Sequence, residues 1–426
     1  MTLAAARRAV GPGGDPRPEP RGAGRAARRQ LMAATALALA LAGCTAAPAP
    51  VPTPAPSSPA GATPTAPPTE PTVSPSPSPS PTPPAPTCRA EAEALSLAER
   101  AGQLVMVGVT GSLDAAERKA ITGSHLGSAI LMGASSRGVR KTARLTASIA
   151  GLADGAGLLI AVDQEGGLVQ RLKGAGFDTI PAAADQAGLS AAKLSRRATT
   201  WGEQLAAAGV QLNLAPVADV VPKGNVRANQ PVAKLRRGYG SDPEKVSQRV
   251  AAFVDGMHVG GVGAAVKHFP GLGAVKGNTD FAAEVVDATT TADSDLLRPF
   301  RDAAANGVDA VMISSAIYRR IDAERIATFS PAVIGLLRGW GYDKVVISDD
   351  LGVARALRDV PAKQRAVRFI DAGGDLAISV EPKAAVAMAK GLVARAQEDE
   401  AFAERVTESA ARVLALKQDY DLIACR

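Results

Sequence analysis

The sequence from Cys88 to Arg426 predicts a single (β/α)8 barrel of the TIM type. Short apolar runs alternate with Ala-rich, charged stretches of helical character, and each run is continuously apolar, as in parallel strands covered on both faces. The stretches between them carry helix starts such as SDPEKV, where Ser241 or Asp242 caps the helix and Pro243 lies in the first turn. An open doubly wound sheet is the alternative fold. In chain order we expect strands at residues 102–108, 127–133, 158–164, 210–217, 262–269, 308–315, 344–350 and 374–380.

Residues 1–43 have the pattern of a bacterial export signal. They hold seven arginines against two acidic residues, followed by the apolar run LMAATALALALAG, which is too short to span a membrane as a stable helix. The letters LAGC end at Cys44 and match a lipobox, so we expect Cys44 to be lipidated after cleavage. An ordinary cleaved signal is the alternative, and RRQLM at 28–32 leaves twin-arginine export open. The expected location is the outer face of the bacterial cell membrane, through a lipid anchor.

The following segment, residues 44–87, predicts a disordered tether. It consists almost entirely of Pro, Ala, Thr, Ser and Val and ends in SPSPSPSPTPPAPT. Such a composition buries too little apolar surface to offset the ordering entropy. Extended at roughly 3.1 Å per residue, it reaches on the order of 130 Å. We expect it to hold a catalytic or binding domain, residues 88–426, away from the membrane.

The net charge gives no case for a nucleic-acid partner. The chain carries +7, and the leader supplies +5 of it, seven arginines less two acids, so the remainder carries +2. Nucleic-acid binding calls for basic residues clustered on the folded part. We therefore expect no nucleic-acid partner. We also expect a monomer.

Besides Cys44, the chain has two cysteines, Cys88 and Cys425, at the two edges of the predicted domain. In an exported protein they suggest a disulfide that joins the termini. Such a bridge requires a fold whose ends meet, as those of a closed barrel do. Two free thiols are the alternative.

Polar residues gather at the carboxyl ends of the predicted strands. Asp163, Lys267, His268, Ser315 and Asp349 all stand there. Barrel enzymes place their sites at this end, so the pattern predicts an active site. Carboxylates beside cationic and hydrogen-bonding side chains suit sugar recognition and glycosidic cleavage.

Other chemistries lack their motifs. The chain has three histidines and no His-x-x-x-His or paired-cysteine spacing, so we expect no metal, and His125 and His258 are interpreted as structural. There is no Walker loop and no G-x-S-x-G elbow, and GLGAVKG at 271–277 has the wrong spacing for a dinucleotide turn. We expect no cofactor.

Four motifs resemble the signatures of glycoside hydrolase family 3, specifically its single-domain bacterial β-N-acetylglucosaminidases. They are AVDQEGGLVQRL, RRGYGSDPE, KHFPGLG and VVISDDLG, and the similarity covers about residues 95–420. The resemblance implies a retaining exo-β-N-acetylglucosaminidase that removes terminal N-acetylglucosamine from peptidoglycan-derived glycans such as muropeptides through a glycosyl-aspartate. It places Asp349 as the nucleophile, and strand alternation favours Asp349 over Asp350 because adjacent residues face opposite ways. The residues implied to grip the sugar hydroxyls are Asp163, Arg171, Arg237, Lys267 and His268.

The chain departs from this family where the general acid is expected. Relatives usually carry Asp-x-His on the loop after KHFPG, whereas the window here reads Asn278, Thr279, Asp280. Leu272 replaces a further histidine, and Ser315 stands where relatives often have one after the sixth strand. The usual catalytic pair is therefore absent.

Three interpretations follow. Asp280 acts as general acid and base, ~5 Å from Asp349, if a dry site or a nearby carboxylate raises its pKa. Alternatively an anion such as phosphate attacks the glycosyl-enzyme, which makes the protein a phosphorylase. Thirdly, the protein is a lipoprotein that binds sugars without cleaving them. Specificity for the acetamido group rests on the resemblance alone, so a β-glucosidase also stays open.

Overall fold

The computed structural model describes residues 88–153, 155–279 and 281–425. The predicted export signal, the predicted lipidation site Cys44 and the predicted tether lie outside the described residues, and so does Asp280. No helix in the described ranges is long and apolar enough to cross a membrane.

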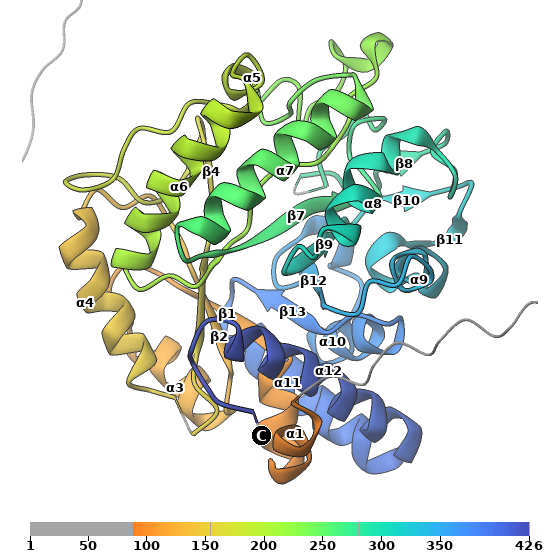
Figure 1. Cartoon of the computed structure of the whole chain (residues 1–426). Helices are drawn as coiled ribbons and strands as arrows, with labels where there is room; N and C mark the ends of the chain where they lie inside the picture. The colour runs from red at the N-terminus through yellow and green to blue at the C-terminus, as the bar shows by residue number, and fades with distance from the viewer. Residues whose placement is uncertain (1–87, 154, 280, 426) are drawn as a thin grey trace, which may run out of the picture. The chain divides into compact units, whose positions relative to one another are not determined.

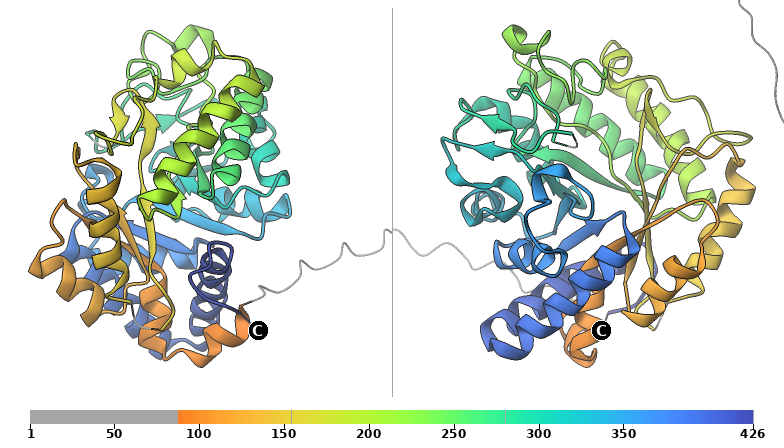
Figure 2. Two further views of the ribbon diagram at one scale, coloured as in Figure 1. Left: turned by 60° about the vertical axis from the view of Figure 1, so that its left-hand side comes forward. Right: turned by 180° about the vertical axis from the view of Figure 1, so that it is seen from behind.

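Eight parallel strands in the described ranges close into a barrel, which confirms the predicted (β/α)8 fold (Figures 1 and 2). Around the barrel the strands follow the order β1-β13-β12-β9-β7-β6-β3-β2. Every predicted run overlaps one of them. Their bounds are β1 Val105–Val109, β2 Ser128–Leu131, β3 Leu159–Val162, β6 Leu212–Asn213, β7 Gly263–Phe269, β9 Ala310–Ile313, β12 Val345–Asp350 and β13 Leu376–Ser379.

Helices surround this barrel and cover the outer faces of the strands (Figure 2). Asp242 caps α7 by accepting from the backbone N–H groups of Glu244 and Lys245, with Pro243 in the first turn, as the sequence indicated. The principal helices are α2 Leu97–Gln103, α3 Ala115–Gly123, α4 Gly138–Ala150, α6 Ala191–Ala207, α7 Pro243–Val259, α8 Arg298–Ala305, α9 Pro331–Gly339, α10 Ala362–Asp371, α11 Pro382–Glu398 and α12 Glu400–Gln418. Shorter elements are α1 Arg89–Ala94, α5 Ala183–Gln186, the hairpin β4 Gln164–Gly166 and β5 Val169–Gln170, and a small sheet of β8 Val286–Asp287, β10 Ile317–Tyr318 and β11 Asp322–Ile326.

The first predicted run, 102–108, starts too early. Its first two residues belong to α2, because Ser96 and Glu99 form a reciprocal capping box that begins a helix at Leu97. The strand therefore begins at Val105.

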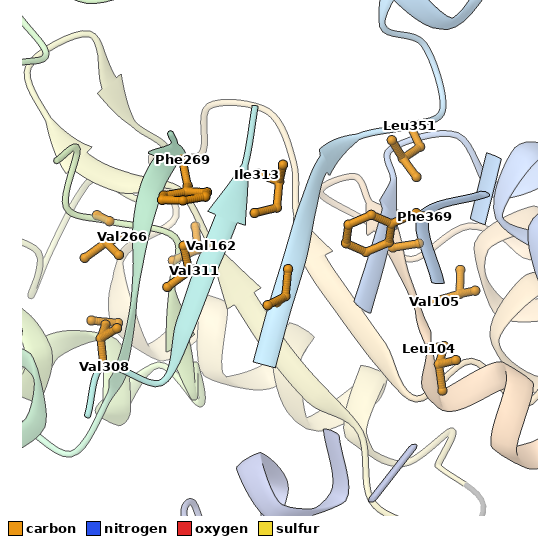
Figure 3. Close-up of a cluster of buried hydrophobic side chains, with 14 of the residues drawn as sticks. Leu104, Val105, Val162, Val266, Phe269, Val308, Val311, Ile313, Leu351 and Phe369 are labelled. Atoms are coloured by element: carbon orange, nitrogen blue, oxygen red, sulfur yellow. The ribbon is translucent and has the colours of Figure 1, made fainter. Parts of the chain in front are cut away.

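The apolar core has two parts, one on each face of the strands. Met106 and Ile347 point into the barrel, whereas Val105 and Val346 pack in the layer between strands and helices. Figure 3 shows side chains of that outer layer, including Val266, Phe269 and Phe369. Because both faces are buried, the strands read as continuous apolar runs.

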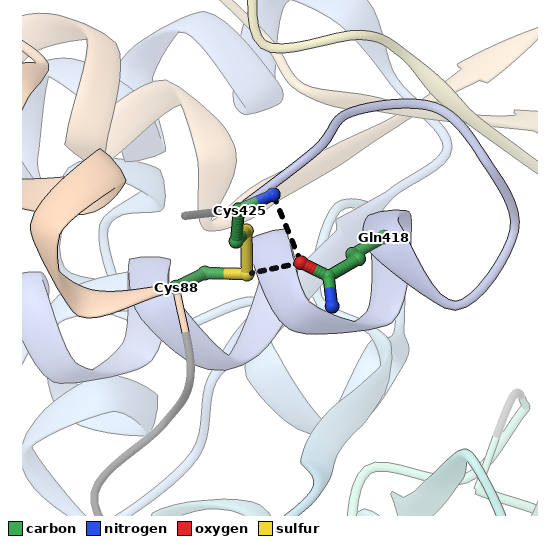
Figure 4. The surroundings of a disulfide bond; sticks show 3 residues. All are labelled: Cys88, Gln418 and Cys425. Carbon is green, nitrogen blue, oxygen red and sulfur yellow. Dashed lines mark hydrogen bonds between the residues drawn. A yellow bond between two sulfur atoms is a disulfide. The ribbon is translucent and has the colours of Figure 1, made fainter.

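A disulfide joins Cys88 to Cys425, with 5.1 Å between their Cα atoms (Figure 4). The backbone N–H of Cys425 donates to Gln418 Oε1 at 2.9 Å, which ties the end of the chain to α12. The bridge therefore fastens residues just before α1 to residues just after α12 and closes the barrel domain at its two ends.

Candidate active site

A cavity of about 550 Å³ opens at the carboxyl ends of the strands. Its apolar floor comes from barrel residues such as Ile130, Leu214 and Met312. Parallel strands all end on this side of the barrel, which brings together residues far apart in the sequence. Six of the seven predicted catalytic and sugar-binding residues line the cavity: Asp163, Arg171, Arg237, Lys267, His268 and Asp349.

A buried network of charges forms one wall. Lys267 Nζ lies 2.6 Å from Asp163 Oδ1 and 2.7 Å from Glu165 Oε1. Arg237 makes a two-point pair with Glu165, with Nη2 to Oε1 at 2.8 Å and Nε to Oε2 at 2.9 Å. Two carboxylates thus face two cations in the wall of the cavity.

Electrostatics keep this network charged. Burial would raise the pKa of Glu165, but Arg237 and Lys267 hold that pKa well below its usual range. Burial would likewise lower the pKa of Lys267, but Asp163 and Glu165 raise it above its usual value. The cationic heads are therefore fixed and charged at neutral pH.

Sequence reasoning missed Glu165, which is 4% exposed. The signal was present, because Glu165 lies two residues after Asp163 in AVDQEGG and residues two apart in an extended segment share a face. A carboxylate there can pair with Lys267, as Asp163 does.

His268 is oriented by a second residue that the sequence reasoning missed, Asp219. His268 Nδ1 lies 2.8 Å from Asp219 Oδ2, and His268 Nε2 lies 3.3 Å from Arg237 Nη2. Because a guanidinium group only donates, Nε2 accepts and the ring proton lies on Nδ1, which donates to Asp219. Asp219 Oδ1 also accepts from the backbone N–H groups of His268 at 3.0 Å and Leu272 at 2.9 Å.

Arg171 follows the β4–β5 hairpin and lines the cavity. Its Nε is buried and has no hydrogen-bond partner among the described residues. A buried donor without a partner is costly, and a ligand that accepts from it would remove the cost. Arg171 therefore offers a donor suited to a sugar oxygen.

The two aspartates at the end of β12 have different surroundings. Asp350 accepts from the backbone N–H groups of Gly352, Val353 and Val380, each at 2.9 Å. Asp349 is half-buried, lines the cavity, and accepts from the backbone N–H of Asp350 at 2.8 Å. Both aspartates line the cavity. The carboxylate of Asp350 holds the loop after β12 through its three hydrogen bonds, so Asp349 is the better candidate to meet a ligand.

The loop after KHFPG borders the cavity on both sides of Asp280, which itself lies outside the described residues. Asn278 and Thr279 line the cavity and are buried, whereas Phe281 lines it at 76% exposure. Leu272, at the position of the histidine that relatives carry, is a buried part of the lining.

Three other singled-out residues lie outside this lining. Ser315 is 2% exposed, and its hydroxyl has no partner among the described residues. His258, on α7, pairs with Asp309 at 2.6 Å, and this hydrogen bond raises the pKa of His258. His125 lies between α3 and β2, near the amino ends of the strands. In the described ranges, no group of three His, Cys, Asp or Glu side chains is arranged to hold a metal ion.

A closed barrel that holds carboxylates beside cations at its carboxyl end belongs to a class that includes many glycoside hydrolases. Comparison with known proteins identifies the family. The model described as "Glycosyl hydrolase family 3 N terminal domain" matches residues 96–416. The chain belongs to glycosyl hydrolase family 3, as its motifs indicated.

Curated relatives and solved structures agree with this assignment. A beta-hexosaminidase of Tolumonas auensis is 34% identical over 306 residues, which cover 68% of this chain and 86% of the relative. The structure of the beta-N-acetylhexosaminidase from Beutenbergia cavernae is 43% identical with a TM-score of 0.75, and the match covers 76% of this chain and 99% of that one. The structure of a family 3 beta-N-acetylglucosaminidase from Paenibacillus is 34% identical with a TM-score of 0.70. That match covers 78% of this chain and 64% of the Paenibacillus chain. The chain is therefore a glycoside hydrolase that groups with the beta-hexosaminidases of its family.

Proposed function

We propose that this beta-hexosaminidase is a retaining exo-β-N-acetylglucosaminidase that acts through a covalent glycosyl-aspartate at Asp349. The observation that supports it most is that Asp349 shares one cavity with the charged wall of Lys267, Arg237 and Asp163. A fixed carboxylate opposite a set of donors is what nucleophilic attack on a held sugar ring needs.

The charged wall would bind the sugar hydroxyls. Lys267 and Arg237 donate, Asp163 accepts, and His268 faces the cavity beside Arg237. Glu165 is buried behind the two cations and acts as a positioning residue, because it fixes their heads through three contacts of 2.7 to 2.9 Å. Because these side chains are already ordered before the sugar binds, more of the binding energy is available to orient the sugar ring.

The reaction would run in two displacements. Asp349 attacks the anomeric carbon, the glycosidic bond breaks, and the leaving oxygen takes a proton from a general acid. Water then attacks the same carbon, gives a proton to that residue, and releases the sugar with its anomeric configuration retained. We assign the acid and base role to Asp280, since its neighbours Thr279 and Phe281 line the cavity.

The substrate we propose is terminal N-acetylglucosamine on peptidoglycan-derived or related glycans. The named activities of the relatives support the acetamido sugar. A cavity of about 550 Å³ is large enough for one sugar with part of its leaving group. We propose in addition that the chain is exported and lipidated at Cys44, which the mass of the mature amino terminus would test.

Turnover of a natural muropeptide, followed by NMR, tests the function. We expect the protein to release N-acetylglucosamine in phosphate-free buffer, and we expect the sugar to be released first as the β anomer. An α anomer would contradict retention. Turnover only with phosphate would make the protein a phosphorylase, and binding without turnover would make it a sugar-binding lipoprotein. If the protein hydrolysed a β-glucoside as fast as the matching β-N-acetylglucosaminide, the proposed specificity for the acetamido group would be wrong.

A further inference from the structure

A second hollow lies on the outside of the barrel, apart from the catalytic cavity. It measures about 540 Å³ and lies between the segment 178–181 and the first half of α6. The basic residues of its lining are Lys193, Arg196 and Arg197, and Asp178 is the one acid in it. None of its lining residues also lines the catalytic cavity.

The three basic residues form one stripe on α6. Their spacing places Lys193, Arg196 and Arg197 on the same helix face, and all three are exposed. Within the described part of the chain none of them takes part in an ion pair. Like charges four residues apart destabilise a helix by roughly 0.2–0.5 kcal/mol, so the stripe carries a local cost that an anionic ligand would offset.

The neighbouring helix α4 carries a parallel stripe. Arg140, Lys141 and Arg144 are exposed on one face, and Arg137 stands one turn earlier at the amino-terminal cap. The backbone N–H of Gly138 donates to the carbonyl of Lys173 at 3.0 Å, which places Lys173 beside this cap.

The two helices that carry these stripes lie side by side. Figure 1 shows α4 and α6 as neighbours on one side of the barrel, and the hydroxyl of Thr146 on α4 donates to the carbonyl of Ala208 at the end of α6. Asp178, in the segment between them, donates its backbone N–H to Gln204 on α6 at 2.9 Å. We call the resulting surface the basic face; its basic residues are Arg137, Arg140, Lys141, Arg144, Lys173, Lys193, Arg196 and Arg197.

The eight basic residues of the basic face stand out because the whole chain after residue 43 has a net charge of only +2. We propose that the basic face binds a polyanionic polymer whose phosphate or carboxylate groups repeat along the chain, with the hollow beside Arg196 and Arg197 as its deepest point. Arginine suits this ligand because its planar fork makes two-point hydrogen bonds to phosphate and carboxylate. Binding there would hold the enzyme on an anionic matrix while the catalytic cavity stays open.

The shape of the surface favours a polymer over a membrane. A membrane-binding face combines basic residues with exposed apolar anchors. The exposed large hydrophobic residues of the described chain belong neither to α4 nor to α6; they are Leu168, Val226, Val259, Phe281 and Val353. The hollow is also concave, which fits a chain better than a flat bilayer.

The test compares three full-length proteins: the natural sequence, the triple variant Lys193→Gln/Arg196→Gln/Arg197→Gln, and the control Lys363→Gln/Lys383→Gln/Lys390→Gln. The control removes the same charge from exposed positions on α10 and α11. The basic leader is common to all three, so differences report on the folded part. The probes are fluorescent long-chain polyphosphate and poly-L-glutamate, read by anisotropy at low and high salt.

We expect the triple variant to bind at least one polymer about tenfold more weakly, and the control to stay within twofold of the natural protein. Rising salt must weaken binding by the natural protein, because exposed charges are screened. Hydrolysis of a small chromogenic substrate must be unchanged in the triple variant. Equal weakening in variant and control, no saturable binding, or tighter binding to phosphatidylglycerol vesicles or duplex DNA than to either polymer would each overturn the proposal.

Discussion

Glu165 and Arg237 form a two-point ion pair, with nitrogen to oxygen distances of 2.8 and 2.9 Å, and Arg237 lines the candidate catalytic cavity. The side chains are 4% and 14% exposed, so solvent screens the pair only weakly. The same carboxylate holds Lys267 at 2.7 Å. One buried residue thus positions both cations that are proposed to hold the sugar.

Replacing Glu165 with Gln should affect both binding and stability. Two cations would remain buried with one fewer carboxylate, and removing one partner of a buried pair costs about 3–5 kcal/mol. KM for the glycan should rise at least tenfold, and the urea midpoint should fall. A matched control is Asp375→Asn, since Asp375 is buried against Arg338 and Arg405 before β13, outside the cavity. It should lose stability and keep its KM; equal KM values in both variants would refute the positioning role.

Replacements at Asp349 and Asp350 should have opposite effects. Asp349→Asn removes the proposed nucleophile, so kcat should fall by about 10³ or more with stability unchanged. Asp350→Asn leaves one backbone N–H facing an amide donor, at a cost of about 1–3 kcal/mol in unfolding free energy. Steady-state kinetics and urea unfolding of both variants check this. If Asp350→Asn lost activity and Asp349→Asn lost stability, Asp350 would be the nucleophile and Asp349 the structural residue.

Phe281 should contribute to binding of the leaving group. An aromatic ring that is 76% exposed at the mouth of a sugar site offers a surface for the apolar face of the next sugar. Phe281→Ala should lower kcat/KM for a disaccharide about fivefold and leave β-N-acetylglucosaminyl fluoride within twofold, because that substrate has no leaving sugar. Val259→Ala, at 75% exposure on α7, is the control. Equal losses on both substrates would exclude a leaving-group contact.

Lys417 should make the stability of the protein depend on pH above neutrality. This lysine is fully buried on α12 and donates to the carbonyls of Ala156 and Gly157. It has no carboxylate partner among the residues that the structure describes, and burial lowers its pKa to about 7. The unfolded chain keeps a pKa of about 10.4. Between these values the unfolded state binds more protons, so the free energy of unfolding should rise with pH from about 7 to about 10. In Lys417→Met the rise of the unfolding free energy with pH, measured by urea unfolding, should be smaller. If the rise were unchanged, a group other than Lys417 would cause it.

The disulfide should stabilise the domain without taking part in catalysis. Cys88 and Cys425 join the two ends of the barrel domain, away from the residues of the cavity. Reduction should lower the free energy of unfolding by about 2–4 kcal/mol, mainly because it frees the unfolded chain. Unfolding of Cys425→Ser with and without reductant checks this. If reductant lowered the unfolding free energy of Cys425→Ser still further, a disulfide other than Cys88–Cys425 would be responsible.

The barrel was predictable from the sequence because each strand is buried on both faces. Continuous apolar runs such as 262–269 and 344–350 therefore stood out from the helical stretches around them. The small sheet of β8, β10 and β11 was not predicted, since its strands are short and partly exposed. The predicted start of the first strand was wrong because the first two residues of the apolar run, 102–103, complete the last turn of α2.

The site was predictable where a polar residue ends a strand. Asp163, Lys267 and Asp349 interrupt apolar runs and meet at the cavity. Asp219 gave no such signal, because it follows an irregular segment and acts through His268 rather than on the cavity itself. The basic face was hidden for another reason: its two stripes lie on α4 and α6, about fifty residues apart, and net charge averages over them.

The most direct test of the proposed mechanism is to trap the covalent intermediate. The full-length protein is incubated with a 5-fluoro β-N-acetylglucosaminyl fluoride, digested, and mapped by mass spectrometry. The predicted result is one added sugar on the peptide that contains Asp349, with no addition in Asp349→Asn. A sugar attached to another residue, or steady turnover of a natural glycan by Asp349→Asn, would contradict it.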